Sequence, residues 1–225
     1  MALNRFSASN IQARLTVGDW TLPLAQGEQI VISSRRPGED HVMLMDAPLV
    51  FVGYGVKAPE RDWDDFKGQD VKGKILVVLI NDPDFDGPIA DGGPDFNGKA
   101  MTYYGRWTYK YEEAAKRGAA GVMIVHEDAP ASYGWNTVKN SNTNTMFDVV
   151  RANPAASHTG FESWVTASTA RKLFADAGLD FDAAKAAAAR ATRAASAAFA
   201  PGSVANLESW GMSLSLPPIC TMKRP

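Results

Sequence analysis

The chain has 225 residues, of which 45% are hydrophobic and 21% are charged, and its formal net charge is −2. This length supplies enough apolar residues for a core and favours one domain, or one domain with an appendage. Charges of both signs are mixed without a basic stripe or a long block of like charge, which excludes nucleic acid as an expected partner.

The first half of the chain is predicted to form β-strands. Residues 11–17 alternate apolar and polar side chains, as a half-buried strand does, and Gly18-Asp19 predicts a hairpin turn into residues 20–24. Gly53 and Gly55 indicate a bulge or a close approach of the backbone. Further strands are expected at 28–33, 41–45 and 48–56.

A strand, loop, helix and strand follow. The apolar run 75–80 predicts a strand buried on both faces, and the Gly-, Asp- and Pro-rich residues 84–99 predict a long loop. A helix is expected next, because Gly118 is placed to end it and four residues share helical spacing: Trp107, Tyr111, Ala114 and Ala115. Since the helix leads into an apolar run at 121–125, the runs 75–80 and 121–125 are expected to be parallel neighbours.

The second half is predicted to be less regular. Residues 127–157 are expected to form a polar loop, 161–166 a strand and 168–177 a helix, and Asp180 or Asp182 is placed to cap a last helix that runs to Phe199. The end of the chain has no periodic core pattern. We therefore expect a domain at 1–190 and an atypical tail at 191–225 that arises from truncation or a shifted reading frame. A tail strand in the main sheet would count against that origin.

Six strings of residues occur in order within 11–189. They are Pro48-Leu-Val-Phe-Val-Gly-Tyr-Gly-Val56, Asp64-Asp65-Phe66, Asp70-Val-Lys-Gly-Lys74, Asn81-Asp82-Pro83, Tyr103-Tyr-Gly-Arg-Trp-Thr-Tyr-Lys-Tyr-Glu-Glu-Ala-Ala115 and Arg117-Gly-Ala-Ala-Gly-Val-Met-Ile-Val-His126. Together they resemble the protease-associated (PA) domain that is inserted into bacterial zinc aminopeptidases of the M28 family.

The resemblance implies an α/β (α+β) fold of the PA type, a swivelling β/β/α domain of mixed β-sheets or a β-sandwich with flanking helices. It implies a module packed beside the peptidase domain of the parent enzyme, where it covers the substrate cleft or binds peptide or protein and performs no hydrolysis. Zinc is the cofactor of the parent family, whereas none is expected in this chain.

The resemblance and the sequence differ in what they imply about location. The parent family is usually periplasmic or secreted. Residues 1–10 lack the apolar stretch of a signal peptide, so the chain as given is expected to stay in the cytoplasm. No apolar run approaches the roughly 20 residues of a membrane span.

Two strings imitate parts of a di-zinc ligand set. His126-Glu127-Asp128 has the His-x-Asp form, and Glu112-Glu113 has the form of a general base beside a ligand. The resemblance places the first at the end of a strand of the insert, outside the peptidase domain. The second is expected on the exposed side of its helix, with Lys116 and Arg117 one turn on. We therefore expect no catalytic residue and no metal ligand in the chain.

Nucleophilic catalysis has no motif in this sequence. There is no Gly-x-Ser-x-Gly elbow and no phosphate-binding glycine loop, and Cys220 lacks an obvious basic partner. His41 and His158 are expected to lie at the surface. One enzyme alternative stays open, a stand-alone hydrolase of small esters or peptides whose Ser, His and Asp residues meet only in the folded chain.

The remaining candidate is a recognition surface at the start of the predicted helix. Aromatic residues combined with arginine are typical of binding hot spots. Trp107 and Tyr111 are expected on the core face of the helix, away from the binding residues. The candidate binding residues are Tyr103, Tyr104, Arg106, Tyr109, His126 and Trp135. The sequence thus favours a non-catalytic PA domain, with the hydrolase and a pure protein-interaction module as alternatives.

Overall fold

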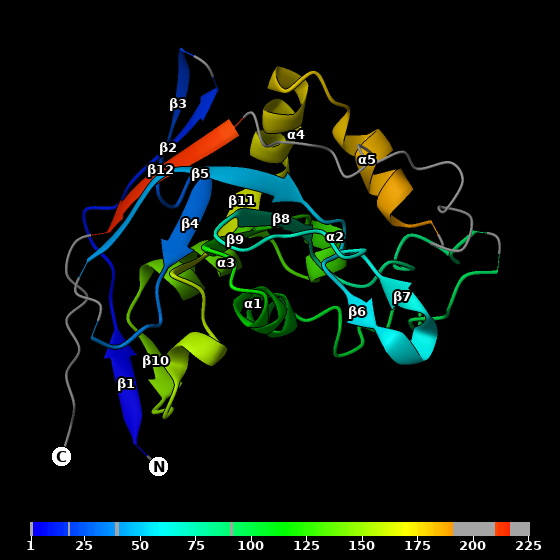
Figure 1. Ribbon diagram of the computed structural model, residues 1–225, viewed down its shortest axis with the longest axis horizontal. Helices are drawn as coiled ribbons and strands as arrows, with labels where there is room; N and C mark the ends of the chain where they lie inside the picture. The colour runs from blue at the N-terminus through cyan, green and yellow to red at the C-terminus, as the bar shows by residue number, and fades with distance from the viewer. Residues whose placement is uncertain (1, 18, 39–40, 91, 191–209, 217–225) are drawn as a thin grey trace.

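A mixed β-sheet with helices on both faces forms the centre of the molecule, in a computed structural model that describes residues 2–17, 19–38, 41–90, 92–190 and 210–216 (Figure 1). This arrangement confirms the predicted α/β fold class. In spatial order, the eight strands of the described sheet are β3 (Trp20–Leu24), β2 (Gln12–Val17), β12 (Trp210–Leu216), β5 (Val42–Phe51), β8 (Ile75–Leu79), β9 (Gly121–His126), β11 (Phe161–Thr166) and β4 (Ile30–Ser33).

Five helices and two small ladders complete the described structure. The helices are α1 (Trp107–Lys116), α2 (Asp128–Ala131), α3 (Trp135–Thr143), α4 (Ala167–Asp176) and α5 (Phe181–Ala188), with single 3-10 turns at Pro59–Arg61 and Pro154–Ala156. The ladders pair β1 (Leu3–Phe6) with β10 (Met146–Val149) and β6 (Lys57–Ala58) with β7 (Trp63–Asp64). Among the helices described, none has the length and apolar composition that crossing a membrane requires.

The sheet carries a hydrophobic core on each face because its central strands are apolar on both sides. Along β8, Val77 packs into the core that contains Phe174 of α4 and Phe181 of α5, whereas Val78 packs into the core that contains Tyr111 of α1 and Val138 of α3. Figure 1 shows α4 and α5 on one side of the sheet and α1 on the other. The parallel pairing of β8 with β9 confirms the predicted crossover.

Most predicted strands and helices in the first 126 residues are confirmed. The hairpin of β2 and β3 places Val17 opposite Trp20, and the helix at α1 is followed by Gly118 with a φ of +70°. The runs predicted at 41–45 and 48–56 differ from the structure, since one continuous strand, β5, spans Val42–Phe51 and residues 52–56 lie outside it. Gly53 and Gly55 come just after it, and a Cβ on Gly53 would lie 3.0 Å from Ala188 Cβ, which confirms a close approach of the backbone.

The prediction of a loop over 127–157 is wrong, because this segment contains α2, α3 and β10. Asn, Ser and Thr have low helix propensity, and their side chains compete for backbone hydrogen bonds. In α3 Asn142 and Thr143 donate to the carbonyls of Val138 and Lys139 one turn back. Burial of Val138 against the sheet anchors this helix, so tertiary packing outweighs local propensity.

The tail of the chain contributes a strand to the main sheet. Residues 210–216 form β12, which pairs antiparallel with β2 on one side and with β5 on the other, and Met212 is fully buried. The predicted origin of the tail stays a prediction. The other tail residues, and the part of the predicted last helix between 191 and Phe199, lie outside the described residues. The domain boundary at residue 190 stays a prediction.

Gly121 begins β9 directly against the ring of Phe161 on the neighbouring strand β11. A Cβ at this position would lie 2.1 Å from Cε1 of the buried Phe161 ring, which sits opposite it on β11. Gly121→Ala is therefore expected to lower the free energy of unfolding by about 3 kcal/mol, the upper end for overpacking a core. Urea denaturation measures the change.

The control for this variant is Gly134→Ala, because the nearest neighbour of a Cβ there is 3.9 Å away. Gly134 precedes α3 as its N-cap, so a loss below about 1 kcal/mol is expected. Similar losses at the two glycines would contradict the tight contact of β9 with Phe161.

Candidate functional site

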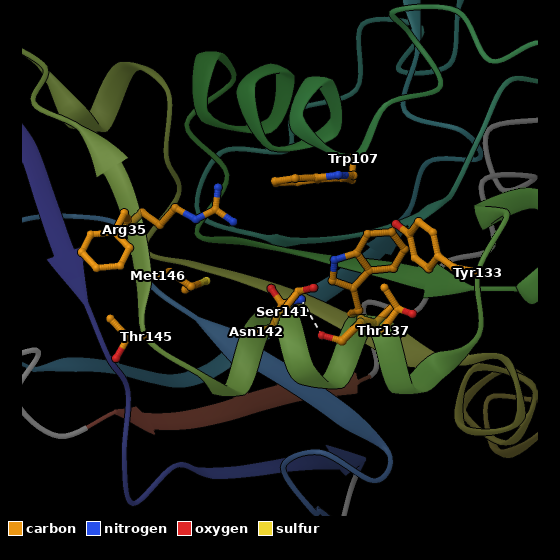
Figure 2. Close-up of a pocket in the computed structure, with 11 residues that line it drawn as sticks. Arg35, Trp107, Tyr133, Thr137, Ser141, Asn142, Thr145 and Met146 are labelled. Carbon is orange, nitrogen blue, oxygen red and sulfur yellow. Dashed lines mark hydrogen bonds between the residues drawn. The ribbon is translucent and has the colours of Figure 1, made fainter. Parts of the chain in front are cut away.

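A cavity of about 440 Å³ opens between α1, α3 and the end of the sheet that carries β4 and β11. Four of its eleven lining residues are aromatic, neutral polar groups lie on the α3 side, and one side chain, Arg35, is charged. The lining residues are Arg35, Trp107, Tyr133, Thr137, Val138, Ser141, Asn142, Thr145, Met146, Phe147 and Trp164. Figure 2 shows the Arg35 side chain reaching into the space between Trp107 on one side and Ser141 and Asn142 on the other. The volume lies within the range of small-molecule sites.

Arg35 is held at this cavity by a fully buried carboxylate. It follows the end of β4, and its Nε lies 3.3 Å from Oε2 of Glu162 on the adjacent strand β11. The guanidinium also lies over the Trp107 ring, 5.1 Å from its centroid. Arg35 Nε forms no hydrogen bond with the described residues. The ion pair and the ring contact therefore orient the guanidinium without using its full donor capacity.

A histidine connects Glu162 to a second carboxylate behind the cavity. His158 Nδ1 lies 2.6 Å from Glu162 Oε1, and His158 Nε2 lies 2.7 Å from Asp148 Oδ2, which also pairs with Arg151. Both ring nitrogens of His158 thus face carboxylate oxygens. Burial alone would raise the pKa of Asp148, but hydrogen bonds from the Val149 amide and Arg151 outweigh it and lower that pKa.

This network corrects the prediction that His158 lies at the surface. His158 is only 6% exposed, since the ladder of β1 and β10 brings Asp148 against it and β11 brings Glu162. His41 is exposed, as predicted.

His126 belongs to an aromatic group that shares two residues with the cavity wall. Its buried ring stacks on Tyr133 at 6.0 Å between centroids and contacts Trp164 at 5.9 Å and Trp135 at 5.7 Å. Trp135 Nε1 donates to the Gly27 carbonyl. Burial lowers the pKa of His126, although its hydrogen bond to Asp128 acts in the opposite direction. His126 thus contacts both cavity residues, and Trp135 packs against His126.

The predicted tyrosine cluster forms at the start of α1, on the opposite side of that helix from Trp107. The ring of Tyr104 contacts those of Tyr103 and Tyr109, at 6.2 and 5.1 Å between centroids. Tyr103 donates to Glu112, which raises the pKa of Tyr103 to about 12, and Tyr104 donates to Glu60.

Two members of the predicted surface differ from the rest. Arg106 is exposed at the N-cap of α1. The prediction that Tyr109 lies off the core face of the helix is wrong, because Tyr109 is 3% exposed and its hydroxyl accepts from the Lys57 amide. The structure therefore brings together the three tyrosines, but not Arg106, His126 or Trp135, into one cluster.

The two strings that imitate zinc ligands make other contacts. His126 Nε2 lies 3.0 Å from Asp128 Oδ1. Glu112 accepts from Tyr103, and Glu113 pairs with Arg117 at 2.9 Å and with Lys116 at 3.8 Å, as predicted. Glu113 is 9% exposed, so its predicted exposure is wrong. Within the described ranges, no three His, Cys, Asp or Glu side chains lie together in a group that could hold a metal ion.

A serine hydrolase would need a serine hydroxyl beside a histidine nitrogen. In the part of the chain that the structure describes, the ring nitrogens of His158 both face carboxylates. His126 Nε2 faces Asp128, and its Nδ1 is buried without a hydrogen-bond partner. Neither of these two histidines is paired with a serine.

A second hollow, of about 390 Å³, lies within the predicted loop 84–99. Its wall includes Asp84, whose Oδ2 accepts from the Phe96 and Gly98 amides, and Lys99, whose Nζ lies over the Phe85 ring at 3.8 Å. These contacts fold the loop on itself. The Arg35 cavity has the stronger combination of aromatic walls and an oriented charge.

Comparison with known proteins gives little further information. No family model and no curated protein matches the chain. Among solved structures, the aminopeptidase from Aneurinibacillus sp. strain AM-1 is similar with a TM-score of 0.40 and 13% sequence identity, over 99% of this chain and 34% of that one. The chain thus spans about a third of the length of that protein.

Proposed function

We propose that the chain is a non-catalytic protease-associated module of an M28-type metallo-aminopeptidase that covers the substrate cleft or binds peptide. The six strings that resemble the PA insert support the family. The Arg35 cavity supports a binding role, because it combines aromatic walls, neutral polar groups and one oriented cation in a volume suited to a small ligand or the end of a peptide. In this proposal zinc belongs to the peptidase domain of the parent enzyme, which is the partner of the module.

Turnover by the purified chain tests the proposal. We expect no hydrolysis of aminopeptidase or esterase substrates, with or without added zinc, and less than one zinc per chain by metal analysis. The hydrolase alternative predicts ester turnover that does not depend on zinc. Tight zinc binding accompanied by aminopeptidase activity would overturn the non-catalytic assignment.

A further inference from the structure

We propose that the Arg35 cavity binds an apolar carboxylate, and that its source is the C-terminal residue of a peptide. This inference rests on the proposed function and specifies the ligand of the same module. The cavity selects for three properties of a ligand: a single negative charge, an apolar or aromatic side chain, and a polar backbone.

The expected negative charge of the ligand follows from the one charged side chain that lines the cavity. Arg35 is the only acidic or basic side chain among the lining residues. A guanidinium binds carboxylates through two parallel N–H groups, and such charge-assisted hydrogen bonds are about twice as strong as neutral ones. Since Glu162 lies on the Nε side of Arg35, the terminal amino groups are the ones available to a ligand.

The charges of the arginines and carboxylates in the network behind Arg35 are balanced. Arg35 and Arg151 face two carboxylates, those of Glu162 and Asp148. The His158 ring lies between the two carboxylates. A carboxylate in the cavity is therefore not repelled by uncompensated acidic groups. A phosphate dianion is a poorer match, because one arginine that already faces Glu162 offers little compensation for a second charge.

The expected apolar or aromatic side chain of the ligand follows from the aromatic residues in the cavity wall. Trp107, Tyr133 and Trp164 present ring surfaces to the cavity, and Val138 and Met146 add aliphatic surface. Rings of this kind pack edge to face with a ligand ring, and their burial excludes water from the ion pair at Arg35. The volume of about 440 Å³ is at the lower end of the range for ligand sites, which suits the end of a peptide better than a long segment.

The backbone of a peptide is matched by the α3 side of the cavity. Thr137, Ser141 and Asn142 lie on successive turns of α3, and Figure 2 shows Ser141 and Asn142 directed toward the space below the guanidinium. The hydroxyl groups of Thr137 and Ser141 can donate to and accept from peptide groups, and the side-chain oxygen of Asn142 can accept, since its Nδ2 donates to the Val138 carbonyl. A free aromatic acid offers the carboxylate and the ring but not these backbone groups.

Isothermal titration calorimetry on the full chain tests the inference with four ligands. These are N-acetyl-phenylalanine, its C-terminal amide, an acetylated tripeptide ending in phenylalanine, and the amide of that tripeptide. We expect each acid to bind at least about tenfold more tightly than its amide, because the amide lacks the charge that Arg35 binds. The tripeptide acid is expected to bind more tightly than N-acetyl-phenylalanine.

Variants assign the effect to this cavity. Arg35→Gln is expected to remove the preference for the acid. Arg36→Gln is the matched control, since Arg36 donates to the His158 carbonyl and does not line the cavity, and it should keep the preference. Because Arg35→Gln also removes a partner of buried Glu162, Arg35→Lys provides a charged variant, expected to weaken acid binding several-fold. Ser141→Trp, at an exposed position of α3, should block both acids without touching the ion pair.

The outcomes separate this inference from the function on which it rests. Equal binding of acids and amides, no binding of either acid at millimolar concentration, or an unchanged preference in Arg35→Gln would overturn the inference. If N-acetyl-phenylalanine bound but the tripeptide acid did not, the ligand would be a small molecule, and a peptide C-terminus as the source of the carboxylate would be overturned. Turnover and zinc content, measured separately, decide whether the chain is catalytic.

Discussion

Replacing Glu162 with alanine is expected to lower the free energy of unfolding by about 3–5 kcal/mol. The Glu162 side chain is fully buried and lies 2.6 Å from His158 Nδ1 and 3.3 Å from Arg35 Nε. Alanine leaves Arg35 and His158 without their shared carboxylate, and an unpaired buried charge such as that of Arg35 is far more costly than the loss of an exposed ion pair. Urea denaturation at neutral pH, with wild type measured in parallel, gives the change.

Glu28→Ala is the control for loss of a glutamate. Glu28 is exposed in the segment before β4, so a change within about 0.5 kcal/mol is expected. If Glu162→Ala were no more destabilising than Glu28→Ala, the network of Arg35, Glu162 and His158 would not be a structural element of the fold.

Removing residues 210–225 is expected to cost about 5 kcal/mol or more, which is comparable to the whole stability of a typical domain. The deletion removes β12 from the middle of the sheet, where it pairs with both β2 and β5 and buries Met212. Both neighbours become exposed edges, which also favours aggregation. Thermal unfolding followed by circular dichroism, together with size-exclusion chromatography, measures the effect.

The matched truncation ends at Leu216 and keeps all seven residues of β12. The difference in stability between the two truncated chains measures the contribution of the strand. If the domain instead ends at residue 190, as the sequence predicts, residues 1–190 should fold without β12 and both truncated chains should be equally stable. A melting temperature that is the same for both truncations would favour that boundary over the paired strand.

The strands of the central sheet could be predicted because their apolar residues are continuous along the chain. The run that forms β8 is apolar at every position, and both cores draw on it. The helix α3 could not be predicted in this way, since Val138 is its only buried residue and becomes informative only once the sheet exists. The strand β12 could not be predicted from local sequence either, because its pairing partners precede it by more than 150 residues.

The tyrosine cluster could be predicted from sequence, whereas the Arg35 cavity could not. Tyr103, Tyr104 and Tyr109 are close together in the chain, so a local pattern indicates them. Arg35 and Glu162 are far apart in sequence and meet only because β4 pairs with β11. One local signal is present in the sequence: Glu162 is the charged residue of a strand that otherwise consists of apolar and small polar residues, and a buried charge requires a partner.

The most direct test of the central claim follows binding and hydrolysis of one peptide in the same sample. The zinc-supplemented chain is titrated with the acetylated tripeptide that ends in phenylalanine and with its unblocked form, and mass spectrometry then establishes whether each peptide is intact. We predict saturable binding that depends on Arg35, with both peptides recovered at full length. Loss of the N-terminal residue from the unblocked peptide, or binding that Arg35→Gln leaves unchanged, would contradict a non-catalytic module that holds peptide carboxylates.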